Sequence, residues 1–360
     1  MFNIMSEGNV YLDKKKDYTY FCPRTATMPD GNILCCFTRS KNKILNDFVP
    51  FYATSASGEV WSEAKPVWPD IATQKAIVAT TPRTTPDGRI ALAGMISDIA
   101  GENDVWWSNE LCAMKANKVF WCVSPDGRNF PPPTEIELPD AAAAEQPGGI
   151  LVKNNGEMLM VYSPCPAIES KRPVTTNRQV LLRSKNGGIN FFHQYFGEIE
   201  HPVLYAESWI VELGNGKLMT CSWITGNEPF ADVYFLSDNG GDTFEGPFEM
   251  PFKGQTTSLT PYKDDYAFIA YNQREYGTTG VWLAFVKIQN NAMTLLANEP
   301  VWKTSSTMIN NKNADFENFT DYAFGEPQVT ILRDGSLFLV FWFDQPHGTG
   351  IHYVKLQGDF

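Results

Sequence analysis

Polar, glycine-containing turns recur along this chain at a regular interval. Residues 237–244 read Ser-Asp-Asn-Gly-Gly-Asp-Thr-Phe, and residues 184–191 repeat that pattern closely. We expect Ser237 and Asp238 to accept hydrogen bonds from amides of their own turn, while the glycines supply positive φ angles and the final ring packs between neighbouring layers. The aromatic residues that close these two turns and two shorter, weaker copies of them lie at 61, 130, 191 and 244, which is 53 to 69 residues apart. A period of this length, built from strands and turns, predicts propeller blades rather than a helical solenoid.

A second kind of turn precedes an apolar run in nearly every unit. The Pro-Asp-Gly turn at 29–31, for example, is followed by the apolar segment 33–37. Because a tight turn before a buried strand is typical of the first hairpin of a blade, each such turn marks one blade. The six turns lie at residues 29–31, 86–88, 154–156, 214–216, 263–265 and 333–335.

The expected fold class is therefore all-β, a six-bladed β-propeller that forms one domain over residues 1–360. The sixth unit ends at 351–356 and has no room for a fourth strand. We expect the extended stretch 8–12 to supply that strand and to close the ring, which removes an exposed sheet edge. The expected blades span residues 21–68, 78–138, 145–199, 207–251, 256–302 and 326–356.

Composition narrows the class of partner. The net charge of -12 argues against nucleic acid, whose phosphates require a basic surface, and no apolar run approaches membrane-spanning length. The seven cysteines lie partly in apolar runs, which favours reduced, buried thiols in a cytoplasmic protein; a secreted protein whose leader had been removed would look the same. No Cys/His spacing indicates a metal, and no phosphate-binding loop or nucleophile elbow is present, so we expect no cofactor.

Charged and aromatic residues gather at positions that the propeller would bring to one face. In a four-stranded blade, the inner strand starts on the face that also carries the loop between the second and third strands. Such a concentration on a β scaffold is typical of a polar-ligand site. The candidates are Arg24, Arg83, Glu145, Glu207 and Glu326 near inner-strand starts, and Arg39, Asp47, Trp106, Arg274 and His347 in the loops, together with Asn227, Glu228 and Tyr276.

With these repeats the chain resembles the sialidase superfamily, six-bladed propellers marked by "Asp-box" turns. The resemblance covers essentially the whole chain. Sialidases use an arginine triad to grip the substrate carboxylate, an Asp as acid/base, and a Tyr–Glu couple as nucleophile. The resemblance implies that Glu207 matches the catalytic Glu, that Asp47 stands near the acid/base Asp, and that Arg39 lies near the site.

The chain also departs from that pattern. Residues 21–23 stand where the first triad arginine is expected, Ser222-Trp223 where the second is expected, and Glu326 where the nucleophilic Tyr is expected. Two missing arginines remove most of a bidentate carboxylate clamp, although Arg24, Arg83 and Arg274 could rebuild one elsewhere. A Glu in place of Tyr suits a neutral sugar, because an anionic sugar would repel it.

The resemblance therefore implies an exo-acting glycoside hydrolase whose partner is a carbohydrate other than sialic acid. We expect Asp47 as proton donor and Glu207 and Glu326 as the carboxylate pair, all meeting at the mouth of the channel with Arg39 close by. Two other functions stay open: a polysaccharide lyase with His347 or a Tyr as base, and a carbohydrate-binding propeller without activity.

Each candidate residue also has a structural interpretation. Glu145, Glu207 and Glu326 could bind amides of an adjacent strand, and Asp47 could be an ordinary loop residue. Arg24 and Arg83 could only balance the charge of the glutamates. Trp106 could be a stacking platform for a sugar ring or a core aromatic, and His347 could be a solvated loop residue.

Overall fold

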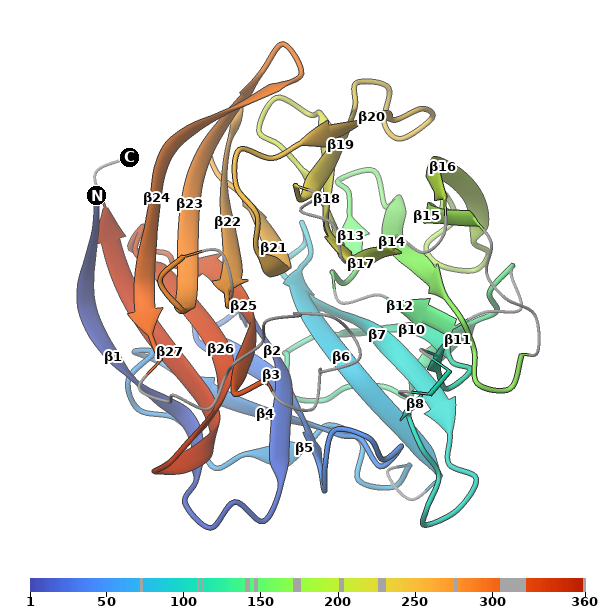
Figure 1. Cartoon of the computed structure of the whole chain (residues 1–360), viewed down its shortest axis with the longest axis vertical. Helices are drawn as coiled ribbons and strands as arrows, with labels where there is room; N and C mark the ends of the chain where they lie inside the picture. The colour runs from blue at the N-terminus through green and yellow to red at the C-terminus, as the bar shows by residue number, and fades with distance from the viewer. Residues whose placement is uncertain are drawn as a thin grey trace.

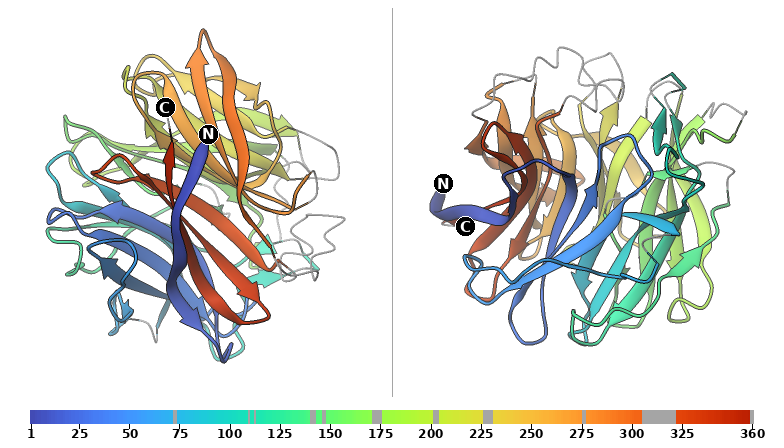
Figure 2. Two further views of the ribbon diagram at one scale, coloured as in Figure 1. Left: turned by 90° about the vertical axis from the view of Figure 1, so that its left-hand side faces the viewer. Right: turned by 90° about the horizontal axis from the view of Figure 1, so that it is seen from below.

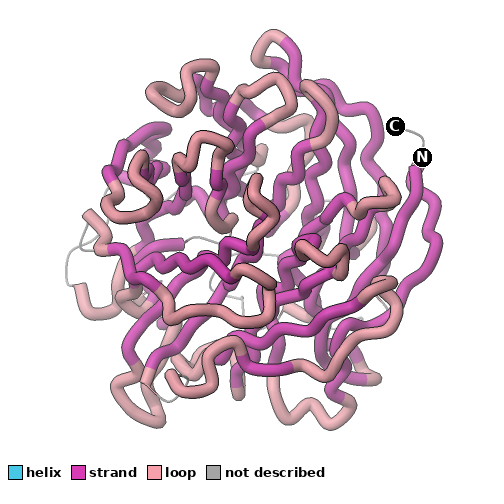
Figure 3. The backbone as a smooth tube through the Cα atoms, turned by 180° about the vertical axis from the view of Figure 1, so that it is seen from behind, coloured by secondary structure: helices cyan, strands magenta, loops and turns pink. Residues whose placement is uncertain are grey.

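Six antiparallel sheets surround a central axis in the computed structural model, each contributing its first strand to the inner ring (Figure 1). The structure describes residues 1–71, 74–108, 110–111, 113–139, 143–145, 148–170, 176–200, 204–225, 231–274, 277–304 and 322–358. Within these residues there is no α-helix (Figure 3), and hence no helix that could span a membrane. The expected all-β, six-bladed propeller is confirmed.

The blades follow one another along the chain, and their strands run outward in sequence order. The first three consist of β2 (Thr19–Thr27), β3 (Ile33–Ser40), β4 (Val49–Ser55) and β5 (Lys65–Pro66); β6 (Lys75–Thr84), β7 (Ile90–Asp98), β10 (Lys118–Ser124) and β11 (Thr134–Ile136); and β12 (Ala143–Glu145) with β13 (Leu151–Val152), β14 (Met158–Cys165), β15 (Thr176–Ser184) and β16 (Phe192–Glu200). A short pair, β8 (Trp107–Ser108) and β9 (Ala113–Met114), lies in the loop between β7 and β10.

The other three blades have the same plan, except that the outermost strand of the last blade comes from the N-terminus. They consist of β17 (Leu204–Glu212), β18 (Leu218–Thr225), β19 (Val233–Ser237) and β20 (Glu245–Glu249); β21 (Gln255–Pro261), β22 (Tyr266–Gln273), β23 (Gly280–Gln289) and β24 (Ala292–Lys303); and β25 (Phe324–Ile331), β26 (Leu337–Gln345), β27 (Gly348–Gly358) and β1 (Phe2–Asp13).

The N-terminal strand closes the ring. β1 pairs antiparallel with β27 from Phe2 opposite Gly358 to Asp13 opposite Thr349, and the two strands lie side by side in both views of Figure 2. The expected closure is thus confirmed, with a longer strand than the predicted stretch 8–12. Because β27 would otherwise expose its unpaired amides and carbonyls, this pairing protects the last sheet edge.

Sandwiching between two neighbouring blades explains the apolar second strands. Every residue of β14 and of β18 is buried, because each blade packs a face against the blade before it and a face against the blade after it. Among the described residues six cysteines are buried and free of disulfides, as the apolar runs around them predict: Cys22, Cys35, Cys36, Cys122, Cys165 and Cys221.

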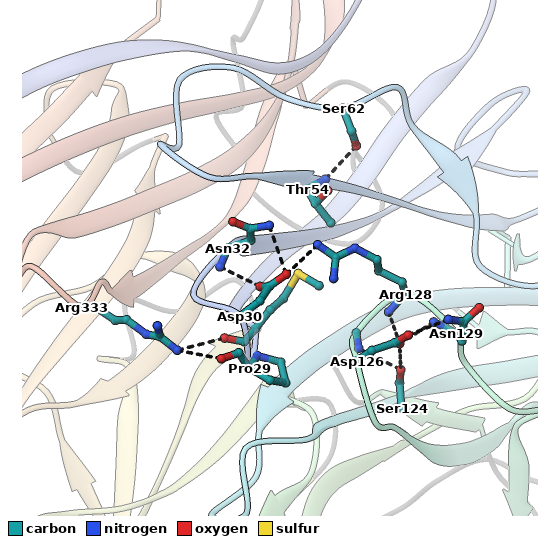
Figure 4. Close-up of polar contacts among 12 residues, drawn as sticks. Pro29, Asp30, Asn32, Thr54, Ser62, Ser124, Asp126, Arg128, Asn129 and Arg333 are labelled. Carbon is teal, nitrogen blue, oxygen red and sulfur yellow. Dashed lines mark hydrogen bonds and ion pairs between the residues drawn. The ribbon is translucent and has the colours of Figure 1, made fainter.

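The Ser-x-Asx-Gly turns share one hydrogen-bond pattern. In the turn after β15, the Ser184 hydroxyl accepts the Gly188 amide at 2.9 Å and Asn186 accepts the Asn190 amide at 3.1 Å. In the turn after β10, Ser124 and Asp126 take the same two roles, and Arg128 bonds Asp30 of the first blade at 2.8 Å (Figure 4).

One detail of the turn at 237–244 differs from the expectation. Ser237 accepts the Gly241 amide at 2.9 Å as expected, but Asn239, not Asp238, accepts the Thr243 amide, at 3.0 Å. Asp238 instead forms an ion pair with Lys217 at 3.0 Å. The second residue after the serine is the one whose side chain reaches back over the turn, because its backbone lies where an Asx side chain can meet amides further along the chain.

Each closing aromatic ring packs against the preceding blade, as the sequence predicts. Phe244 stacks on Phe196 of blade three with ring centres 4.2 Å apart, and Phe191 meets Trp121 of blade two at 6.4 Å. Trp61, near the start of the ring, lies 5.8 Å from Phe338 of blade six. The turns therefore join neighbouring blades as well as reversing the chain.

This packing leads to a prediction that compares two adjacent glycines. A Cβ on Gly188 (φ +85°) would overlap the Trp121 ring, whereas a Cβ on Gly187 (φ +67°) would meet nothing within 4 Å. Gly187→Ala should therefore cost only the positive-φ penalty of about 1 kcal/mol. Gly188→Ala should cost about 1–3 kcal/mol more, because Trp121 must move. Denaturant midpoints of both variants test this; equal losses would contradict the role of the ring.

Candidate functional site

Five inner strands carry the same irregularity at the same place. Each has a β-bulge near its start, and within each bulge one residue that is not glycine has a positive φ of 48–55°. A bulge re-aims side chains, and a left-handed residue other than glycine costs of order 1–3 kcal/mol, so such outliers gather at functional sites. The five residues are Cys22, Ala79, Glu207, Thr256 and Glu326.

The bulges aim most of these side chains at one hollow. A cavity of about 130 Å³ lies at the end of the ring where the inner strands start, and four of the five residues line it; Ala79 does not. This volume has room for several water molecules and hence for a small ligand. The lining residues are Phe21, Cys22, Phe48, Met95, Trp106, Trp107, Met114, Glu145, Glu207, Trp223, Thr256, Arg274, Tyr322, Glu326 and Trp342.

Three carboxyl groups form the polar side of the cavity. Glu145 comes from blade three, Glu207 from blade four and Glu326 from blade six. Glu145 and Glu207 are each 9% exposed, and within the described residues none of the three forms an ion pair. Buried carboxyls without a direct ion pair are costly to the fold, and this cost indicates a functional use.

The hydrogen bonds of these groups separate their roles. Both oxygens of Glu326 accept hydrogen bonds, one from the Cys22 amide at 2.6 Å and the other from the Cys22 thiol at 2.8 Å. Glu207 accepts the Trp223 indole N–H at 3.0 Å. Its own amide donates to Glu145. The three groups are thus linked through side chains and backbone.

Burial and mutual repulsion shift two of the three toward the protonated form. Burial, then the charges of Glu326 and Glu145, raise the pKa of Glu207 well above its ordinary range. Burial raises the pKa of Glu145 to about 8, against the opposing effect of the bond from the Glu207 amide. Because at least one buried carboxyl keeps a proton near neutral pH, the site can hold an acid and a base side by side.

Arg24 and Arg83 lie behind the carboxyl groups and do not line the cavity. Each guanidinium lies 5.3 Å from the ring centre of Trp209, so side chains from β2, β6 and β17 meet inside the ring of inner strands. Arg24 is 2% exposed and donates to the Glu326 carbonyl at 2.9 Å. Its positive charge partly opposes the rise in the pKa values of Glu145 and Glu207. In this structure Arg24 therefore balances the buried carboxyls, and it does not form a substrate clamp with Arg83.

Arg274 is the arginine that reaches the cavity. It follows β22, donates to Gln255 at 2.6 Å and to the Phe324 carbonyl, and lies 3.8 Å from the ring centre of Tyr322. Burial lowers the pKa of Arg274. The cavity thus offers one arginine held by protein groups, where a carboxylate clamp needs several convergent ones.

Asp47 does not meet Glu207 and Glu326, contrary to the prediction. Its carboxylate accepts the Ser40 hydroxyl and the Lys41 amide, the latter at 3.1 Å, within its own loop. The next residue, Phe48, lines the cavity instead. Successive side chains of extended chain point to opposite sides, so an aspartate one position before the lining residue is turned away.

Arg39 and His347 also lie outside the cavity. The Arg39 guanidinium lies 4.3 Å from the ring centre of Tyr18 and 4.5 Å from that of Phe51, so it packs as a cation on aromatic faces. His347 is exposed and stacks on Phe343 at 5.6 Å. The predicted loop residues Asn227, Glu228 and Tyr276 lie outside the described residues.

The structure brings together Glu145, Glu207, Glu326, Trp106 and Arg274 of the predicted set, and it adds residues that the sequence analysis did not name. The most informative addition is Cys22, which holds both oxygens of Glu326. A signal for it was present, because every left-handed bulge residue stands eight positions before the Asp or Asn of the turn that follows. Those turn residues are Asp30, Asp87, Asn215, Asp264 and Asp334.

Metal binding finds no support in the described part of the chain. No group of three or more His, Cys, Asp or Glu side chains there is arranged to hold a metal ion.

Comparisons with known proteins agree on the architecture. A protein of unknown function from Dyadobacter fermentans matches with a TM-score of 0.78 and 16% identity over 99% of both chains. The Hadza microbial sialidase Hz136 matches with a TM-score of 0.67 and 13% identity over 97% of this chain and 68% of that one. The NanB sialidase of Streptococcus pneumoniae matches with a TM-score of 0.65 and 12% identity over 97% and 70%.

The chain has the sialidase propeller fold. No family model matches the sequence, and no curated protein matches it either. At 12–16% identity the likeness to these solved structures describes the scaffold, and the chemistry has to be argued from the cavity itself. In this six-bladed propeller, that cavity combines three carboxyl groups with an aromatic lining.

Proposed function

We propose that this sialidase-like propeller is a glycoside hydrolase that removes a terminal, uncharged sugar. The observation that carries the proposal is the meeting of Glu145, Glu207 and Glu326 in one small aromatic-lined cavity. Two carboxyl groups of different protonation state are what glycosidic bond cleavage requires, one as acid and one as nucleophile or base.

The roles follow from the contacts. Glu326, whose two oxygens both accept hydrogen bonds from Cys22, is the carboxylate that attacks the anomeric carbon or activates a water there. Glu207, whose pKa is raised well above its ordinary range, is the acid that protonates the leaving oxygen. Glu145 accepts the Glu207 amide, and it is one of the groups that, after burial and Glu326, raise the pKa of Glu207.

A neutral substrate fits this charge distribution better than an acidic one. Three carboxyl groups surround the cavity, and the one arginine on its lining is already bonded to Gln255 and to the Phe324 carbonyl. A sugar carboxylate would meet net repulsion and no bidentate clamp. The small cavity favours binding of a single terminal sugar, so we expect cleavage from the end of the sugar chain.

A panel of aryl glycosides in both anomeric forms tests the proposal. We expect turnover on at least one uncharged sugar and a kcat/KM for an aryl sialoside that is lower by at least about 100-fold, which is roughly the effect of losing one charged hydrogen-bonded contact. Efficient release of sialic acid would show that Arg274 and its neighbours still bind a carboxylate. No turnover on any glycoside or natural oligosaccharide would instead support a carbohydrate-binding protein without activity.

A lyase has one observation in its favour, the contact between Tyr322 and Arg274 in the cavity. A lyase acting on a uronate needs a base beside a positive charge, and these two side chains offer that pair. His347, the other expected base, does not line the cavity. A lyase forms a new C=C bond, so an increase in ultraviolet absorbance with an acidic polysaccharide would favour it over hydrolysis.

A further inference from the structure

The cavity has two chemically different sides. Its carboxyl groups and Arg274 come from blades three to six, while blades one and two contribute only apolar side chains and the thiol of Cys22. At the bulge position of blade two stands Ala79, the one apolar residue among the five left-handed bulge residues. The charged groups of the cavity therefore come from one half of the ring of blades, and the other half contributes none.

Four rings form a continuous apolar wall that covers that second side and ends at Trp342 of blade six. Trp106 meets Phe48 edge to face with ring centres 5.2 Å apart, Phe48 meets Phe21 at 6.0 Å, and Phe21 meets Trp342 at 6.0 Å. Met95 completes the lining beside them. We call these five side chains the apolar wall.

The apolar wall is rigid and poor in hydrogen-bond partners. None of its members is more than 6% exposed, and all belong to one buried hydrophobic cluster. Two indole N–H groups are its only polar side-chain atoms, and they can donate but cannot accept. A sugar hydroxyl enclosed against Phe21, Phe48 and Met95 would lose its bonds to water without replacing them, which opposes binding.

A methyl group in that place would favour binding, because it buries apolar surface against aromatic rings and a thioether. We infer that the terminal sugar recognised here is a 6-deoxyhexose, whose methyl group lies against the apolar wall while its ring hydroxyls and glycosidic oxygen face the carboxyl groups. This inference rests on the proposed function for the site but concerns which sugar enters it.

Matched substrate pairs test the inference. Each pair has the same ring configuration and anomer and differs only in the hydroxyl at C6: fucoside against galactoside, rhamnoside against mannoside, quinovoside against glucoside. For the configuration that is cleaved, we expect the 6-deoxy member to have a kcat/KM about 10–100-fold higher, the range that a hydrophobic pocket achieves against an added hydroxyl. Equal rates, or faster cleavage of the parent hexoside, would overturn the inference while leaving the hydrolase proposal intact.

A variant of the apolar wall tests the cause. Met95→Gln keeps the length of the side chain and adds an amide, so the deoxy preference should fall by about 10-fold. Met5→Gln, on the exposed part of β1, is the matched control and should keep the preference. If Met95→Gln fails to fold, Phe48→Tyr adds one hydroxyl at the apolar wall and should shift the ratio in the same direction. An unchanged ratio in a folded wall variant would contradict the inference.

If no glycoside is cleaved, calorimetry of the binding of the free sugars tests the sugar preference separately from the hydrolase proposal. Tighter binding of a 6-deoxyhexose than of its parent hexose would then retain the inference for a protein that binds without hydrolysis. Equal affinity, or no binding of either sugar, would overturn it.

Discussion

Replacing Glu326 by Gln should lower kcat by at least about 10³-fold on the sugar that this protein cleaves. The amide keeps the size of the side chain but removes the negative charge that attacks the anomeric carbon or activates water. Glu326 sits in a left-handed bulge and accepts both the amide and the thiol of Cys22, so its carboxylate is held in one orientation. Because that orientation comes from the backbone, the variant should bind substrate with nearly unchanged KM.

The control for this variant is Glu212→Gln. Glu212 ends the inner strand β17 at the far end from the cavity and pairs with Lys153 at 3.0 Å. It should keep kcat within about twofold, since a partly exposed ion pair contributes little. Circular dichroism and a thermal melt establish that both variants fold. Near-normal turnover by folded Glu326→Gln would place the chemistry at another residue of the cavity.

Replacing Glu207 by Gln should have an effect that depends on the leaving group. A general acid contributes about 10²–10⁴-fold when the departing oxygen needs a proton, and little when it leaves as a stable phenolate. We therefore expect a large loss of kcat on alkyl glycosides or oligosaccharides and a small loss on a dinitrophenyl glycoside. Steady-state kinetics on the two substrate types measure the difference.

The same measurement on Glu145→Gln decides which carboxyl is the acid. If Glu145 shows the leaving-group pattern and Glu207 does not, the two roles are exchanged. An equal loss on both substrate types for Glu207→Gln would falsify its role as proton donor.

The pH profile should follow from the raised pKa values. Burial raises the pKa of Glu145 to about 8 and raises that of Glu207 well above its ordinary range, so the coupled pair still holds a proton at neutral pH. An acid with a raised pKa works until that proton is lost, so the rate on poor leaving groups should persist at neutral pH and fall once the pH rises past the raised pKa of Glu207. On a dinitrophenyl glycoside this alkaline decline should be weaker, because no proton is required.

Interactions between residues close together in the sequence were sufficient to predict the propeller scaffold. The Ser-x-Asx-Gly turns, such as 184–191, depend on hydrogen bonds and φ angles within eight residues, so the sequence alone predicts them. Their spacing predicts six blades, and the short sixth unit predicts closure by the N-terminal strand, which β1 provides. Each of these features depends on residues close together in the chain or on the need to cover a sheet edge.

The sequence also predicted which of several distant side chains meet at one end of the propeller. Glu145, Glu207, Glu326, Trp106 and Arg274 were predicted from one topological fact, that inner-strand starts share a face with the loops after the second strands. All five line the cavity. The end of the propeller at which a residue lies can therefore be predicted without a structure, because the order of the strands determines it.

The direction of each side chain was decided only by the tertiary structure. Asp47 and Phe48 are adjacent, yet only Phe48 reaches the cavity, and Arg24 lies behind Glu326 while Cys22, two residues earlier, holds its carboxylate. A shift of one residue reverses the side to which a strand residue points, and the bulges that impose this shift belong to the pairing of each inner strand with the second strand of its blade. Composition and turn spacing therefore determine the propeller, whereas the register of the bulged inner strands determines which charges meet inside it.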